Sequence, residues 1–351
     1  MKYLCLILTA ITFLTSFVAA EAHHSFAATF IEDETIQVEG VVTEFSFRNP
    51  HVLIYLDVMN DDGTTTNWMS EGSSATALRR TGWSRDSFEK GDLLRVSGNA
   101  TRDGSPMVSI EKVEVLDPND RSSTAIFEPG GYGGSGRERA REPETIPLKL
   151  ADGRPNLTGN WLENRTERKG RPGEQDPPLP WNGTGAALQT DWNPANDPQV
   201  FCDPPGVVRQ ASWTPHPIRI IQNDDHIVFE YEEYGGRRVI KLSDELPQPG
   251  AKSHLGDAVA HYEGDTLVVR NVNLLGNPTG TSGNRLSDQT TTTEVYRRAD
   301  DPRYGAQVAI KTTITDPGHL QEPWVIERLK MYAANYEFIE NDCRPPLRER
   351  N

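Results

Sequence analysis

Alternating apolar and polar positions divide the chain into two groups of short strands. The first group comprises residues 36–47 (IQVEGVVTEFSF), 51–58, 64–71, 93–100 and 107–116. Branched and aromatic residues in partial alternation are typical of half-buried strands. Between the third and fourth runs, residues 74–81 (SATALRRT) predict a short helix that Ser73 or Ser74 caps.

This order of elements indicates the architecture of the first domain. Three strands, a helix and two further strands follow one another, which is the order of the OB-fold, a small and partly open barrel. We therefore expect an OB-like barrel over residues 23–116. An unrelated five-stranded barrel is the alternative.

A second group of strand patterns fills the C-terminal half. The runs are 218–222, 226–233, 238–242, 266–272, 290–297, 307–315, 323–331 and 336–339. Many short strands joined by turns predict a larger antiparallel barrel or sandwich, which we place at residues 146–351. Residues 117–145 contain GGYGGSGRERAREPE without an apolar period and are expected to form a flexible linker. The predicted fold class is thus all-β with two domains.

The N-terminus has the features of a secretory signal peptide. Lys2 is followed by an apolar stretch over residues 4–18 and by Ala20-Glu21-Ala22, whose small residues suit a signal peptidase. We expect cleavage after Ala22, or alternatively after Ala20, and a periplasmic or secreted protein. The stretch is too short for a membrane span, and no second candidate follows.

Charge and motif content exclude several classes of partner. The 36 basic and 51 acidic residues give a net charge of -15, which repels phosphate backbones, so nucleic acid is not an expected partner. The patterns GxGxxG, GxxxxGK, HExxH and Gly-x-Ser-x-Gly are absent. No nucleotide cofactor, zincin site or serine nucleophile is therefore predicted.

Two cysteines stay in the mature chain. Cys5 lies in the signal segment, whereas Cys202 and Cys343 follow much later. In an oxidising compartment such a pair predicts a disulfide, worth at most about 5 kcal/mol by chain entropy. Two unpaired thiols are the alternative.

Several motifs carry a resemblance to known families. With His-His-Ser-Phe-Ala at residues 23–27, Phe-Arg-Asn-Pro-His at 47–51 and Gly82-Trp83, the first domain resembles an exported bacterial family of uncharacterised function. The run YEGDTLVV at 262–269 resembles a domain common in exported proteins of environmental bacteria, where Trp stands in place of Tyr262. The resemblance implies two domains and a periplasmic address, and it implies no activity.

The mature N-terminus is the first candidate for chemistry. A chain that starts at His23 offers an α-amine and an imidazole, and His51 supplies a second imidazole, a ligand set that copper prefers. We expect residues 31–35 to turn, so that His23 falls near His51, with Glu71 as the nearest carboxylate. His24 alternates to the other side of an extended chain. The alternative is a frayed polar terminus.

Residues 254–263 are the second candidate, for an enzyme. There His261 with Asp257 is a predicted acid and base pair, and Arg238 a predicted anion clamp for a small organic or carbohydrate substrate. The further predicted ligand-binding residues are Glu230, Glu232, His254 and Glu263. A plain hairpin turn around Glu263 is the alternative.

Three hypotheses of function follow from these patterns. The leading one is a periplasmic or secreted binding protein that takes copper through its mature N-terminal histidine. The second is an enzyme of lyase, isomerase or hydrolase type that acts in the second domain. The third is a protein-interaction module. The sequence does not set the oligomeric state.

Overall fold

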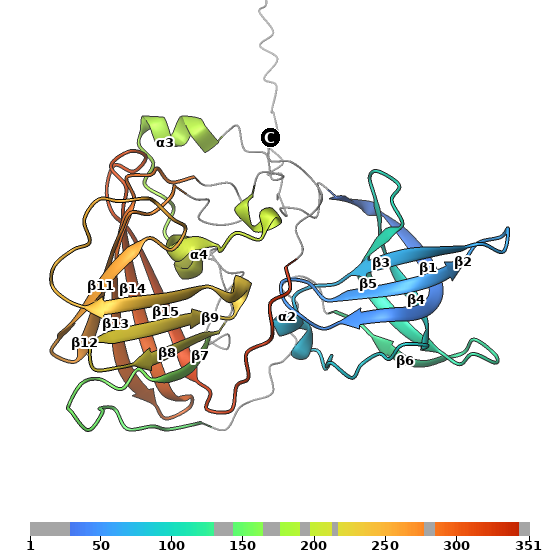
Figure 1. Cartoon of the computed structure of the whole chain (residues 1–351), viewed down its shortest axis with the longest axis horizontal. Helices are drawn as coiled ribbons and strands as arrows, with labels where there is room; N and C mark the ends of the chain where they lie inside the picture. The colour runs from blue at the N-terminus through green and yellow to red at the C-terminus, as the bar shows by residue number, and fades with distance from the viewer. Residues whose placement is uncertain are drawn as a thin grey trace, which may run out of the picture.

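The computed structural model describes residues 29–129, 143–163, 176–189, 197–212, 217–276 and 285–343. The predicted signal peptide, His23 and His24 lie outside these residues. Two β domains stand side by side, as predicted (Figure 1). Among the described residues, none of the helices is long and apolar enough to cross a membrane.

The first domain is the OB-like barrel expected from the order of its elements. Its elements are β1 (Phe30–Ser46), β2 (Leu53–Met59), β3 (Thr65–Glu71), α2 (Ala75–Arg79), β4 (Leu93–Thr101), β5 (Met107–Leu116) and β6 (Ser123–Phe127). The strands follow the order β3-β2-β1-β4-β5-β6, and a parallel pairing of β3 with β5 closes the five-stranded barrel. Alternate residues such as Ile54 and Leu56 are fully buried in its core, as the alternation predicts.

The predicted turn at residues 31–35 is wrong. β1 runs without a reversal from Phe30 to Ser46, and Phe30 pairs with Thr101 of β4. The register shifts between Phe30 and Thr35, and Asn99 donates a hydrogen bond to the carbonyl of Glu32 at 2.9 Å. The residues between Phe30 and Thr35 are accommodated in this irregularity, since a bulge bends a strand without ending it.

The predicted flexible linker is wrong at both ends. β6 lies within residues 117–145 and pairs antiparallel with β5. Glu144 bridges to Gly305 of the second domain, and its carboxylate accepts a hydrogen bond from the backbone N–H of Ala334 at 2.9 Å. Between these ends, residues 130–142 lie outside the described residues.

The second domain is a closed barrel, which decides between the barrel and the sandwich. Its strands are β7 (Gly159–Glu163), β8 (Ile218–Gln222), β9 (His226–Tyr231), β10 (Arg237–Leu242), β11 (Asp257–Glu263), β12 (Thr266–Val272), β13 (Thr291–Asp301), β14 (Gly305–Thr315) and β15 (Trp324–Tyr332). They close in the order β10-β11-β12-β13-β14-β15-β7-β8-β9. Neighbours are antiparallel except β10 and β11, which run parallel over a short register.

Two strands of this barrel were not expected. The sequence pattern does not indicate β7 and β11, because a Gly-Asn start in β7 and small residues in β11 weaken the alternation. The predicted strand at residues 336–339 is wrong, since no strand forms there.

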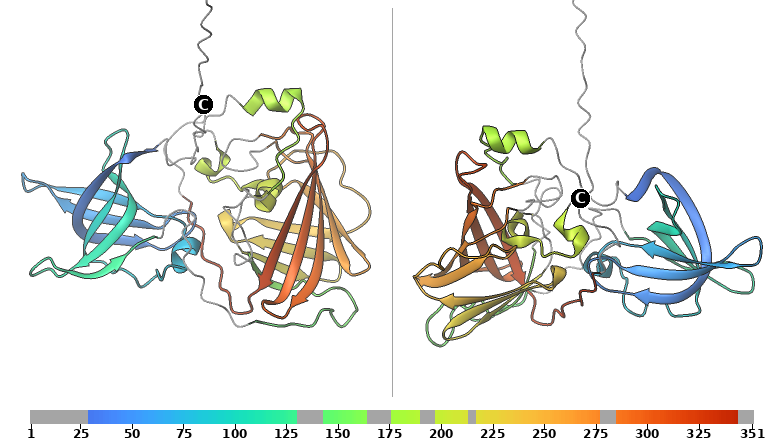
Figure 2. Two further views of the ribbon diagram at one scale, coloured as in Figure 1. Left: turned by 180° about the vertical axis from the view of Figure 1, so that it is seen from behind. Right: turned by 45° about the horizontal axis from the view of Figure 1, so that its top comes forward.

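Short helices close one end of the second barrel. They are α3 (Gly183–Leu188), η3 (Pro198–Phe201), α4 (Gly206–Ser212) and, between β9 and β10, η4 (Glu233–Gly235). Among them, α4 lies at the end of the barrel (Figure 2). Val208 of α4 packs with Ile314, Trp324 and Ile326 in one apolar cluster. A separate cluster around Trp161, which is fully buried, fills the barrel interior.

A C-terminal segment, residues 333–343, crosses from the second barrel to the first domain. It runs past α2 between the two domains (Figure 1). Ile339 is only 3% exposed and belongs to the core cluster of the first domain. The backbone of Asn49 accepts a hydrogen bond from the N–H of Asp342 at 2.7 Å and donates one to the carbonyl of Glu340 at 2.9 Å. We call residues 333–343 the clasp.

The predicted disulfide is confirmed. Cys343 at the end of the clasp is bonded to Cys202, which directly follows η3 of the second domain. The clasp therefore leaves the second domain at β15 and is covalently tied back to it at Cys202. Because 141 positions separate the two cysteines, the bridge closes a long loop and restricts the unfolded chain strongly.

Ile339→Ala tests whether the clasp is part of the first core. We expect the free energy of unfolding to fall by about 2–5 kcal/mol, since the change leaves a cavity in a packed core. Urea denaturation of the full chain measures this loss. Ile126→Ala is the control, because Ile126 of β6 is 58% exposed and its change is expected to stay within about 0.5 kcal/mol. Equal stability of the two variants would contradict the assignment.

Candidate functional site

The carboxylate of Glu232 lies buried where the two domains meet. The hydroxyl of Thr76 in α2 donates to its Oε1. Its Oε2 accepts from the hydroxyl of Tyr336 at 2.8 Å and from the N–H of Ile339 at 3.0 Å. Asn49 of the first domain in turn donates to Thr76 at 3.1 Å. Glu232, predicted to bind a ligand, is therefore the residue that joins both domains and the clasp.

His51, a predicted metal ligand, lies two residues before β2, at the end of the β2–β3 pair where β3 finishes at Glu71. Its Nδ1 is 3.0 Å from the carbonyl oxygen of Gly72 and 3.4 Å from Oε1 of Glu71. Because both neighbours are oxygen acceptors, we assign the tautomer in which Nδ1 donates to them, which leaves Nε2 as the possible ligand atom. The side chain is 36% exposed. Glu71 is the carboxylate beside His51, as predicted.

Across the junction, the turn between β9 and β10 faces this end of the first barrel. Burial and the carboxylate of Glu233 raise the pKa of Tyr234 well above its usual range, and Glu71 contributes in the same direction. Tyr234 has a φ of 53°, in the left-handed region that non-glycine residues rarely adopt. Its hydroxyl donates to the carbonyl of Gln199 at 3.3 Å. The Gln199 side chain donates to Glu233 at 2.9 Å.

The predicted catalytic group does not assemble. His261 and Asp257 lie on the outer face of β11, four residues apart, which is about 13 Å along a strand. His261 Nε2 contacts Glu263 at 2.8 Å, and Asn273 donates to Asp257 at 2.7 Å. Arg238 points into the barrel and is 5% exposed. The barrel wall thus separates Arg238 from His261, and these residues form no common site.

Arg238 belongs instead to a buried polar network inside the second barrel. It pairs with Glu294 at 3.0 Å, donates to the hydroxyl of Tyr231 at 2.8 Å and contacts the side-chain oxygen of Asn271. Tyr296 donates to Glu294. Burial raises the pKa of Tyr231 and of Tyr296, so both hydroxyls stay protonated. The positive and negative charges of the pair balance within the barrel.

Glu230 does not share a face with Glu232 or approach Arg238. It lies on the outer face of β9 and pairs with Arg219 at 3.2 Å and with Arg237 at 3.5 Å. These are partly exposed pairs, which contribute little to stability.

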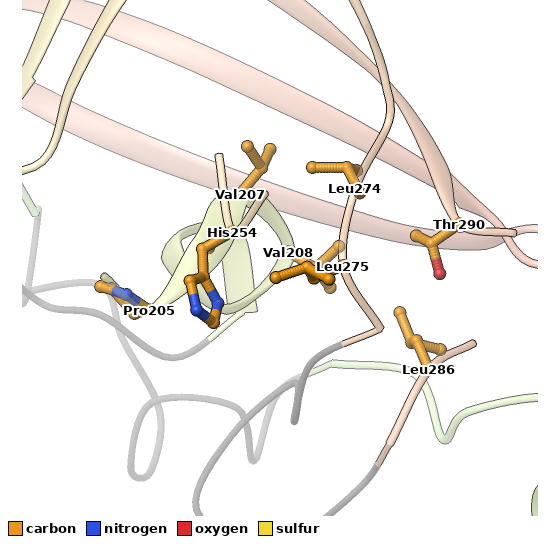
Figure 3. A pocket seen from close by; sticks show the side chains of 9 residues that line it. Pro205, Val207, Val208, His254, Leu274, Leu275, Leu286 and Thr290 are labelled. Carbon is orange, nitrogen blue, oxygen red and sulfur yellow. The ribbon is translucent and has the colours of Figure 1, made fainter. Parts of the chain in front are cut away.

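His254 lines a small pocket beside α4. Figure 3 shows its imidazole near Val207 and Val208, across from leucines of the β12–β13 connection. The pocket has about 240 Å³ of empty space, part of it open to solvent, and its lining is mostly apolar. The enclosed part is only about 10 Å³, about enough for one water molecule. His254 Nε2 is also 3.5 Å from a carboxylate oxygen of Asp203.

Within the described ranges, no three side chains of His, Cys, Asp or Glu gather closely enough to hold a metal ion. His51 with Glu71 is a pair, and further nitrogen ligands would come from His23, which lies outside those ranges.

Comparison with known proteins finds a family resemblance in the N-terminal part of the chain. The model of a family of unknown function, DUF6152, matches residues 12–108. This range includes His23, His24 and His51, while the family description names no activity. A search of curated proteins finds no match. The expected similarity of the first domain to a family of uncharacterised function is confirmed.

Arg238→Met tests the structural role of the buried network. Removing the cation leaves Glu294 buried without its charge partner, and we expect a loss of about 3–5 kcal/mol in the free energy of unfolding. The matched control is Arg237→Met on the same strand, whose side chain lies outside the barrel and whose loss is expected to stay below about 1 kcal/mol. Chemical denaturation compares the two. If Arg238→Met were as stable as the control, the network would not stabilise the fold.

Proposed function

We propose that this is an exported binding protein, periplasmic or secreted, whose first domain binds Cu(II). The ligands are the α-amine and imidazole of His23 at the mature N-terminus together with Nε2 of His51. The observation that carries the proposal is the hydrogen bonding of His51. A ligating histidine commonly donates its other ring N–H to a carbonyl or carboxylate, which orients the ring, and His51 has both acceptors beside Nδ1.

The path of the chain supports the reach of His23. The carbonyl of Thr29 accepts a hydrogen bond from the N–H of Arg102 at 2.9 Å, at the turn between β4 and β5. The N–H of Met69 on β3 donates to Pro106 in the same turn at 3.0 Å. β1 therefore starts beside the seam of β3 and β5, and β3 ends at Glu71.

The length of the N-terminal segment limits how far His23 can reach. His23 stands six positions before Thr29, and an extended chain spans at most about 3.6 Å per residue, or about 22 Å. His51 lies beside Glu71, the last residue of β3. Glu71 follows Met69, the residue that pairs with Met107, by two positions. This route replaces the hairpin that the sequence suggested.

Ligand chemistry selects copper among the divalent ions. Amine and imidazole nitrogens suit Cu(II), which also has the highest affinity of the first-row divalent ions for a given site. The disulfide between Cys202 and Cys343 supports an oxidising compartment, in agreement with the signal-like N-terminus.

One added residue tests the proposed chelate. In a protein that starts at Ala22, the α-amine moves away from the His23 imidazole although every side chain stays. We expect its Cu(II) affinity to fall more than about 100-fold relative to a protein that starts at His23, since loss of a ligand exceeds the effect of an outer contact. Isothermal titration measures the affinity, and electron paramagnetic resonance counts the nitrogen ligands.

Two histidine variants complete this test. His51→Ala should lose Cu(II) affinity to a similar extent while the metal-free protein keeps its melting temperature. His226→Ala is the control, because His226 lies in the second domain beside Asp225. Equal Cu(II) affinities of the two N-terminal forms would overturn the chelate.

A further inference from the structure

The strand register of the first barrel brings two methionines together. Met69 on β3 is the Cα partner of Met107 on β5, although 38 positions separate them in the chain. Neighbouring strands lie about 4.8 Å apart, and paired residues point to the same side of the sheet. Two thioether side chains therefore lie next to each other on one face.

That face is the outer face of the barrel. The next residues on the two strands, Ser70 and Val108, are fully buried, so they point inward. Met69 and Met107 alternate with them and point outward. Both are partly exposed, and neither belongs to the core cluster of this domain.

We propose that Met69 and Met107 form a binding site for a soft monovalent metal ion, Cu(I), for which Ag(I) is the probe. Thioether sulfur is a soft ligand that prefers Cu(I) over Ca²⁺ or Mg²⁺. Two residues further along the same face of β3 lies Glu71, whose carboxylate favours a cation nearby. The site uses other atoms than the proposed Cu(II) site and does not depend on it.

Packing alone is a weak explanation for this pair. The chain has five methionines, and besides Met1 only Met59, Met69, Met107 and Met331 are present. Leucine covers a strand surface with similar volume and resists oxidation, whereas an exposed thioether is converted to the sulfoxide in an oxidising compartment. Adjacent outward thioethers are therefore better explained by ligand binding.

The position of the pair relates it to the N-terminus. Met69 and Met107 both lie beside the turn between β4 and β5, and β1 starts beside the same turn. β1, which follows the His23 segment in the sequence, thus starts next to the thioethers. Nitrogen ligands for Cu(II) and sulfur ligands for Cu(I) would lie along one seam of the barrel.

Methyl resonances of methionine test the site directly. The full mature protein is labelled with ¹³C at the methionine ε-methyl groups and titrated with Ag(I). We expect the resonances of Met69 and Met107 to shift together, while those of Met59 and Met331 stay in place. Single Met→Leu variants assign the four signals. Equal shifts of all four, or no shift at Met69 and Met107, would overturn the proposal.

Affinities provide the second measurement. Met69→Leu and Met107→Leu should each weaken Ag(I) binding at least about 10-fold, because each removes a ligand, and volume-conserving swaps keep the fold. Met59→Leu is the matched control, since Met59 is 77% exposed at the far end of β2. Unchanged Ag(I) affinity in Met69→Leu would contradict the site.

The protein that starts at Ala22 separates this proposal from the Cu(II) chelate. It should keep the full Ag(I) response at Met69 and Met107, whatever happens to its Cu(II) affinity. If its Ag(I) response disappears, the soft ion binds at the N-terminus and the thioether site is wrong. A loss or retention of Cu(II) binding concerns the chelate alone.

Discussion

The buried carboxylate of Glu232 is the constraint on which the arrangement of the two domains depends. A carboxylate out of contact with water is costly unless hydrogen-bond donors surround it. Its donors come from α2 of the first domain through Thr76, and from the clasp through Tyr336 and Ile339. These donors can be in place together only when the first domain, the second barrel and the clasp have docked. Satisfying one charge therefore sets the relative position of all three.

This junction also places the β9–β10 turn opposite the end of the first barrel that carries His51. Asn49 connects to Thr76 by its side chain and to the clasp by its backbone, and His51 follows two residues later. The turn that carries Tyr234 lies opposite, close enough for Glu71 to raise the pKa of its hydroxyl group. The disulfide between Cys202 and Cys343 holds the far end of the clasp. His51, the proposed Cu(II) ligand, lies in the β1–β2 connection, which the hydrogen bonds of Asn49 tie to α2 and to the clasp.

Local patterns predicted most of the strands, because alternation directly reports which face of a strand is buried. β5, β8 and β12 have the predicted bounds, and the order of elements predicted the OB-like barrel. Contacts between distant residues leave no local pattern. Thr76 and Glu232 are 156 positions apart, and nothing in either segment indicates the other. Ile339 in an irregular segment looked like a strand residue, since burial against another domain and burial in a sheet select the same apolar type. The disulfide was predictable because its chemistry needs only two cysteines and an oxidising compartment.

The same reasoning explains why the sequence predicted some neighbouring residues of the candidate sites and missed others. The segment around His261 has imidazole and carboxylates close in sequence, yet an extended strand holds His261 and Asp257 about 13 Å apart along one face. Arg238 of β10 lies on the other side of the barrel wall. Met69 and Met107 are far apart in sequence, and only the parallel register of β3 and β5 reveals that they are neighbours. The barrel closure that makes this register also brings the start of β1 to the seam. In the first domain the pairing that closes the barrel therefore also places the proposed sulfur ligands near the start of β1.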